Sequence, residues 1–141
     1  MILLDANILI HSNQPASPHY PAITERLTAF AENNEELAVC PQVLYEYYVV
    51  ATRPLAQNGY GISADDAIEQ INIFKSGYTF IDDPENLISE WQAIINKYKT
   101  IGKTAHDARL VALMQAQAIE QIYTMNPADF NRYADIITVL N

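Results

Sequence analysis

The chain begins Met1-Ile2-Leu3-Leu4-Asp5-Ala6-Asn7-Ile8-Leu9-Ile10, and this stretch sets the pattern for the rest of the sequence. Its first four residues are apolar without a break, which predicts a strand that is buried on both faces of a sheet. The apolar run stops at Asp5, and Asn7 follows before apolar residues resume. A carboxylate at the end of a buried strand is costly unless hydrogen-bond donors or a cation satisfy it. Asp5 therefore either caps a short following helix or belongs to a functional site.

Composition limits the class of protein. The chain has 141 residues, of which 50% are hydrophobic and 18% are charged, which predicts one globular domain over residues 1–141. No apolar run is long enough to cross a bilayer and no basic segment follows Met1, so we expect no membrane association. Cys40 is the only cysteine, so no internal disulfide can form, and we expect the protein to be located in the reducing cytoplasm. The net charge of −9 argues against a passive nucleic-acid binder, but less against an enzyme that meets phosphates through metal ions.

Short apolar runs alternate along the chain with segments of helical periodicity. The expected strands are residues 1–4, 37–40, 78–81, 122–124 and 136–139. The expected helices are residues 6–12, 21–32, 41–52, 63–77, 84–102 and 104–114, with Asp83 as a helix cap. This alternation predicts an α/β fold, a three-layer sandwich around a mostly parallel sheet of four to five strands. In such sheets functional sites form at the carboxyl ends of the strands, where Asp5 lies.

Two further carboxylates are isolated in apolar surroundings. Glu46 is the only charged residue between Leu37 and Thr52, in a predicted helix without a clearly polar face. Asp107 lies in the first turn of the helix predicted from Thr104, which is apolar nearly all round after it. Each has a structural alternative, since Glu46 could bond a buried tyrosine and Thr104-x-x-Asp107 could be a capping box. Together with Asp5 they form a pattern that indicates a shared site.

A cluster of oxygen ligands without cysteine or grouped histidine favours Mg²⁺ or Mn²⁺ over Zn²⁺. Like charges held close together raise each other's pKa values, so such a cluster needs a cation. The chemistry that suits this arrangement is the hydrolysis of a phosphate ester.

Four segments resemble the PIN domain, and in particular the VapC-type toxins, which are ribonucleases of prokaryotic toxin–antitoxin pairs. These segments are Leu3-Leu4-Asp5-Ala6-Asn7-Ile8-Leu9, Pro41-Gln42-Val43-Leu44-Tyr45-Glu46, His106-Asp107-Ala108-Arg109-Leu110-Val111-Ala112, and Tyr123-Thr124-Met125-Asn126-Pro127-Ala128-Asp129-Phe130. They come in the family's order and with its usual spacing, and the resemblance spans nearly the whole chain.

The resemblance implies a metal-dependent endoribonuclease in which Asp5, Glu46 and Asp107 hold Mg²⁺ or Mn²⁺. Asn7 and Thr104 would support the site from behind the ligands. The family usually has a fourth acid after its late strand, and here the matching position is Asn126. Asp129, three residues later, either completes the metal site or caps a turn.

The resemblance also implies partners, namely an RNA substrate, a VapB-like antitoxin and a second copy of the chain in a homodimer. Three basic residues near the expected site, Arg53, Lys103 and Arg109, are candidates to contact RNA phosphates. The aromatic residues Tyr47, Tyr48 and Tyr60 have no obvious core role, which gives indirect support to a partner surface.

Two alternatives remain open from the sequence. A phosphatase of the haloacid dehalogenase type also places an aspartate after its first strand, but it needs a second aspartate where this chain has Asn7. A PIN-like domain that has lost activity and only binds RNA or an antitoxin would be consistent with Asn126. The three intact carboxylates argue against it.

Overall fold

A parallel sheet of five strands lies at the centre of the computed structural model, which describes all residues 1–141. The strands lie in the order β3 (Thr79–Phe80), β2 (Leu37–Val39), β1 (Ile2–Leu4), β4 (Gln121–Tyr123) and β5 (Thr138–Leu140). Every pairing is parallel. The central position of β1 explains its unbroken apolar run, because both of its edges and both of its faces are covered.

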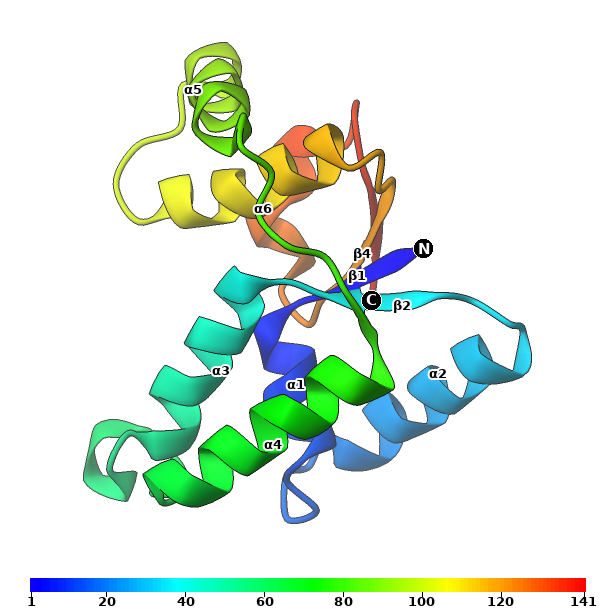
Figure 1. The fold of residues 1–141 in the computed structure, drawn as a ribbon, viewed down its shortest axis with the longest axis vertical. Helices are drawn as coiled ribbons and strands as arrows, with labels where there is room; N and C mark the ends of the chain where they lie inside the picture. Colours follow the sequence, from blue (N-terminus) through cyan, green and yellow to red (C-terminus); the bar gives the residue numbers. More distant parts are fainter.

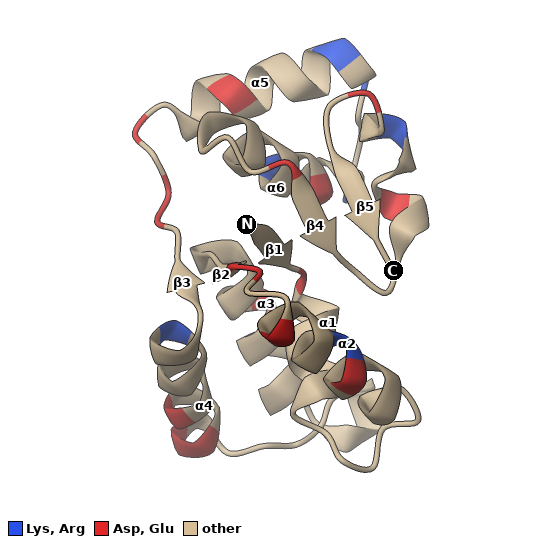
Figure 2. Cartoon of the chain, turned by 90° about the vertical axis from the view of Figure 1, so that its right-hand side faces the viewer, with Lys and Arg blue, Asp and Glu red and all other residues tan.

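Six helices cover the two faces of the sheet (Figure 1). The helices of one layer are α1 (Ala6–Ser12), α2 (Tyr20–Glu32), α3 (Pro41–Thr52) and α4 (Ala64–Gly77). The other layer holds α5 (Leu87–Tyr98) packed on α6 (Thr104–Ala116), and Figures 1 and 2 both place this pair across the sheet from the first four helices. Three short 3-10 turns complete the structure, at Leu55–Gln57, Pro127–Asp129 and Asn131–Tyr133. The predicted α/β sandwich with a parallel sheet is confirmed.

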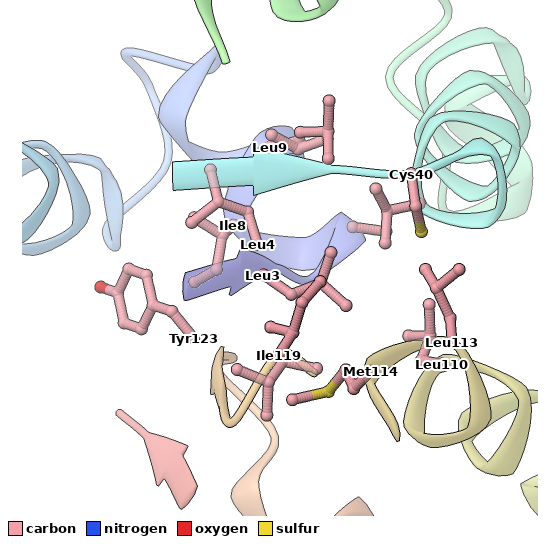
Figure 3. Close-up of a cluster of buried hydrophobic side chains, with 14 of the residues drawn as sticks. Leu3, Leu4, Ile8, Leu9, Cys40, Leu110, Leu113, Met114, Ile119 and Tyr123 are labelled. Carbon is pink, nitrogen blue, oxygen red and sulfur yellow. The ribbon is translucent and has the colours of Figure 1, made fainter. Parts of the chain in front are cut away.

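The core is continuous through the three layers. Leu3 and Leu4 on β1 are fully buried, and they lie between Ile8 and Leu9 of α1 and the apolar side of α6 (Figure 3). From α6 the side chains of Leu110, Leu113 and Met114 are buried against the sheet (Figure 3). None of the helices combines the length and apolar character needed to cross a membrane.

Most element boundaries lie within two residues of the sequence prediction, and the helix expected over residues 84–102 differs most because it spans only Leu87–Tyr98. Asp83 does not cap this helix, since Asn86 occupies the cap position and the Asp83 carboxylate is bonded to Arg109 (2.6 Å). The last strand begins at Thr138 rather than at residue 136, since the two preceding N–H groups donate to the Tyr133 carbonyl and continue a turn.

Tyr47 was expected to lack a core role, and this expectation is wrong. Its side chain is 1% exposed, its ring meets Phe74 edge-on at 5.0 Å, and its hydroxyl accepts a hydrogen bond from Asn13 (3.1 Å). Tyr48 and Tyr60 are half-buried and pack against the core as well. These tyrosines therefore give no support to a partner surface.

Candidate active site

A cleft of about 410 Å³ opens beside the carboxyl ends of β1 and β4. Most of its polar lining comes from the residues that the sequence singled out. Its lining residues are Asp5, Ala6, Asn7, Ile10, Tyr45, Glu46, Val49, Val50, Asp107, Asn126 and Asp129. Four carboxylates from four parts of the fold thus share one cleft: the end of β1, one helix on each face of the sheet, and the turn after β4.

The Asp5 side chain is fixed by hydrogen bonds on both of its oxygens. Oδ1 accepts from the Ala6 N–H (2.7 Å), so Asp5 caps α1 as the structural alternative proposed. Oδ2 accepts from the Thr124 hydroxyl (2.6 Å) and from the Asn7 amide (2.8 Å). Asp5 is only 8% exposed and still lines the cleft, so the capping and functional interpretations hold together.

Thr124 joins the end of β4 to this corner and is fully buried. Its hydroxyl oxygen accepts from the Asn126 N–H (3.0 Å) and from the Asn7 amide (3.2 Å) while it donates to Asp5. The side-chain oxygen Oδ1 of Asn7 in turn accepts from the Met125 N–H (3.1 Å). Asn7 therefore ties the first strand to the turn after β4, which is the supporting position expected for it.

Glu46 projects from α3 and is held by a residue one helical turn earlier. The Gln42 amide donates to Glu46 Oε1 (2.9 Å), as the i, i+4 spacing on a helix allows. Burial raises the pKa of the Glu46 carboxyl, and the nearby charge of Asp5 raises it further, while the bond from Gln42 acts in the opposite direction.

Asp107 lies in the first turn of α6 and lines the cleft. Helix α6 covers the face of the sheet opposite to α3, the helix that carries Glu46 (Figures 1 and 2). The capping alternative for it is wrong, because Lys103 occupies the cap position and no side chain caps this helix. Burial raises the pKa of the Asp107 carboxyl to about 6, helped by the charges of Asp129, Asp5 and Glu46. Burial likewise raises the pKa of Asp5 against the effect of its donors, with Asp129 adding to the rise.

These shifts describe a cleft in which four carboxylates repel one another. Such a group favours protons or cations, and its oxygens are the ligands that hard divalent ions prefer. The side chains include no group of three Asp, Glu, His or Cys residues that is arranged to hold a metal ion as it stands. The site therefore has suitable oxygen chemistry for a divalent cation, with side chains that need to adjust around it.

The predicted basic residues lie outside the cleft lining. Arg109 donates to Asp83 and to Gln42 and lines a neighbouring groove. Arg53 ends α3 with its Nε buried and without a hydrogen-bond partner, and Lys103 precedes α6 in an exposed position. Lys and Arg positions, coloured blue in Figure 2, are few in both helical layers.

Thr104 also lies outside the cleft lining, and its hydroxyl donates to the Ile101 carbonyl (2.7 Å). The hydroxyl that supports Asp5 belongs instead to Thr124. Neither Thr124 nor Gln42 was predicted from the sequence as a site residue. A signal existed for both: Thr124 is a polar residue at the end of an apolar strand, and Gln42 is four residues before Glu46 on the same helix.

Comparisons with known proteins agree with this fold. A family model described as the PIN domain matches residues 2–136. A search of curated proteins finds no match. Among solved structures, VapBC2 from Rickettsia felis bound to a promoter DNA fragment aligns over 100% of both chains, with a TM-score of 0.70 and 18% identity.

Two further structures have the same fold. A toxin–antitoxin complex from Klebsiella pneumoniae aligns over 98% of this chain and 97% of its own, with a TM-score of 0.64 and 20% identity. A sarcin–ricin-loop-cleaving VapC toxin from Mycobacterium tuberculosis covers the same shares, with a TM-score of 0.67 and 14% identity. The TM-scores show a shared fold, and the family match extends over nearly the whole sequence. The chain belongs to the PIN domain family.

Proposed function

We propose that this chain is a metal-dependent endoribonuclease and the toxin of a VapBC-type toxin–antitoxin pair. The observation that carries the proposal is the meeting of Asp5, Glu46, Asp107 and Asp129 in one cleft at the ends of β1 and β4. Four mutually repelling carboxylates are costly in a folded protein, and a divalent cation relieves that cost. Hydrolysis of a phosphodiester bond is a reaction that such a cation supports, and one of the solved structures similar to this chain is a toxin that cleaves the sarcin–ricin loop.

Asp5, Glu46 and Asp107 would hold Mg²⁺ or Mn²⁺, with Asn126 and Asp129 completing the site. When bound, the ion would activate a water molecule and neutralise the charge that develops on the phosphodiester. The protein's own part is to place the oxygens. Thr124 and Asn7 fix the Asp5 carboxylate, and Gln42 fixes one oxygen of Glu46.

Solved structures that share this fold support the antitoxin partner that we propose for this chain. Two of these structures are toxin–antitoxin assemblies, and a third is a toxin that cleaves an RNA loop. We infer that this chain also acts on RNA, binds a VapB-like antitoxin and forms a homodimer in the cytoplasm. Light scattering tests the dimer directly, and a monomer at micromolar concentration would contradict it.

The test of the activity is an RNA cleavage assay on the purified chain with Mn²⁺, with Mg²⁺ and with excess chelator. We expect cleavage with either metal and none with chelator. RNA that is bound but left intact in both metals would contradict the nuclease and would favour a binding module. Release of phosphate from small phosphomonoesters without RNA cleavage would favour a phosphatase instead.

A further inference from the structure

A continuous series of polar contacts runs from Asp83, before α5, to Glu46 in the cleft. The Arg109 guanidinium donates through Nη2 to Asp83 Oδ2 (2.6 Å) and through Nη1 to Gln42 Oε1 (3.1 Å). Gln42 Nε2 then donates to Glu46 Oε1 (2.9 Å) and to the His106 carbonyl (2.9 Å). The series joins α3, α6 and the segment before α5, on both sides of the sheet.

Donor and acceptor chemistry fixes the orientation of the Gln42 amide. A guanidinium can only donate, so the amide oxygen must face Arg109. An ionised carboxylate and a backbone carbonyl can only accept, so the amide NH₂ must face Glu46 and His106. Gln42 is 6% exposed, and both its N–H groups and its oxygen are satisfied. A rotated amide would lose all three bonds in a buried place, which is costly.

The amide also keeps two opposite charges apart. The Arg109 guanidinium is bonded to Asp83 and Gln42 rather than to Glu46, and Gln42 is the residue that bonds Glu46. A direct ion pair would occupy Glu46 with a fixed cation. With Gln42 between them, a neutral donor orients Glu46 through Oε1. The Glu46 carboxylate lines the cleft and is not paired with a cation of the protein.

We propose that Gln42 is a positioning residue for Glu46 and that the Asp83–Arg109 ion pair locks Gln42 in its working orientation. This assigns Arg109 a role through Gln42 rather than as a direct contact to RNA phosphate. The proposal rests on the proposed nuclease function where it concerns metal binding and cleavage. The hydrogen-bond series itself can be tested without either.

The first experiment follows the Gln42 side-chain NH₂ by NMR in the metal-free protein, with the signal assigned from Gln42→Met. We expect these protons to exchange with water at least tenfold more slowly than those of the exposed Gln92. Arg109→Met should remove most of that protection. Exchange as fast as that of Gln92 in the wild type would overturn the proposal, whatever the activity of the protein.

The second experiment compares Gln42→Met, Arg109→Met and the matched control Gln92→Met by calorimetric titration with Mn²⁺ and by RNA cleavage kinetics. Loss of a partner that orients a metal ligand typically costs about 10-fold to 100-fold in affinity or rate. We expect Gln42→Met to raise the Kd for Mn²⁺ and lower kcat by about tenfold, with KM for RNA unchanged. Arg109→Met should do the same to a smaller extent, and Gln92→Met should match the wild type.

Denaturant unfolding of each variant separates positioning from folding. If Gln42→Met lowers stability but leaves Mn²⁺ affinity and kcat unchanged, Gln42 is only a packing residue and the proposal fails. If Arg109→Met raises KM without changing kcat or Mn²⁺ affinity, Arg109 contacts RNA and its assigned role fails. A wild type with protected Gln42 protons that neither binds Mn²⁺ nor cuts RNA would overturn the nuclease function and the positioning role with it, while the hydrogen-bond series stands.

Discussion

Asp5 and Asp107 line the same cleft, but the fold holds them in different ways. Asp5 ends a central strand, and three donors from Ala6, Asn7 and Thr124 fix both of its oxygens. Asp107 lies in the first turn of a helix on one face of the sheet, where burial and neighbouring negative charge act on it without a compensating hydrogen bond. One carboxylate is therefore part of the frame of the protein, and the other is placed only by its helix.

The difference separates structural from chemical roles within one site. A carboxylate fixed by several donors contributes to stability as well as to ligand binding. A carboxylate held among like charges costs stability until a cation arrives. Substitution of either acid should thus lower activity to the same extent, whereas only the substitution of Asp5 should lower the stability of the fold.

The largest expected effect is on catalysis. Asp5→Asn, Glu46→Gln and Asp107→Asn should each lower RNA cleavage by on the order of a thousandfold, since each removes a charged metal ligand worth several kcal/mol. Cleavage rates at saturating Mn²⁺ check this, with circular dichroism as the control for folding. If a variant cuts RNA at more than a tenth of the wild-type rate, the carboxylate that it lacks is not a metal ligand.

The next effect is the response of the whole cleft to metal. Mn²⁺ at 100 times its Kd should stabilise the folded protein by roughly 2.7 kcal/mol and raise its Tm, because only the folded state has the assembled site. Thermal unfolding with and without millimolar Mn²⁺ measures the shift. The same Tm in both conditions would contradict a metal site formed by the chain alone.

The contrast between the two acids is sharpest in alanine variants without metal. Asp5→Ala should destabilise the protein by about 1–3 kcal/mol, because it removes the cap of α1 and leaves the buried Thr124 hydroxyl without its acceptor. Asp107→Ala should leave stability unchanged or raise it, since it relieves like charge and alanine favours helices. Denaturant unfolding measures the stability of both variants. Equal losses of stability would contradict the proposed difference between Asp5 and Asp107.

A pH dependence should accompany the raised pKa of Asp107. Its folded-state pKa of about 6 lies above the ordinary value, so the folded protein holds this proton more tightly than the unfolded chain does. As the pH rises from about 4 to about 6, the metal-free protein should therefore lose roughly 1–2 kcal/mol of stability, after allowance for the partial exposure of the Asp107 carboxyl. Unfolding curves over this range should show a smaller loss for Asp107→Asn. If stability depends on pH in the same way in the wild type and in Asp107→Asn, the pKa of Asp107 is not raised.

The smallest effect concerns the turn after β4, where Asn126 and Asp129 both line the cleft. Asn126→Asp adds a charged ligand and should tighten Mn²⁺ binding, whereas Asp129→Asn should weaken it less than Asp5→Asn does. Calorimetric titration of the three variants provides the comparison. If Asp129→Asn matches Asp5→Asn while Asn126→Asp has no effect, Asp129 is the fourth ligand.

Much of this architecture could be predicted from the sequence because its signals are local. The unbroken apolar run before Asp5 marked the central strand, and the isolation of Glu46 and Asp107 marked the cleft. Parallel strands bring their carboxyl ends to one edge, so residues distant in sequence meet there.

Other features depend on contacts that no local pattern encodes. Asp83 before a proline has the sequence of a helix cap, but Arg109, 26 residues later, takes its carboxylate. Thr104 and Thr124 are equally plausible supporting hydroxyls by residue type, and only the pairing of β1 with β4 brings Thr124 to Asp5. Tyr47 is placed in the core by its packing on Phe74 of α4, a neighbour that the sequence does not reveal.

The central claim is that the acids of this cleft share a divalent cation. Its most direct test is the anomalous diffraction signal of Mn²⁺ in crystals of the protein grown with millimolar MnCl₂. We expect a peak in the cleft with oxygens of Asp5, Glu46 and Asp107 within about 2.5 Å of the ion. A well-ordered cleft without such a peak, or Mn²⁺ bound only elsewhere on the protein, would contradict it.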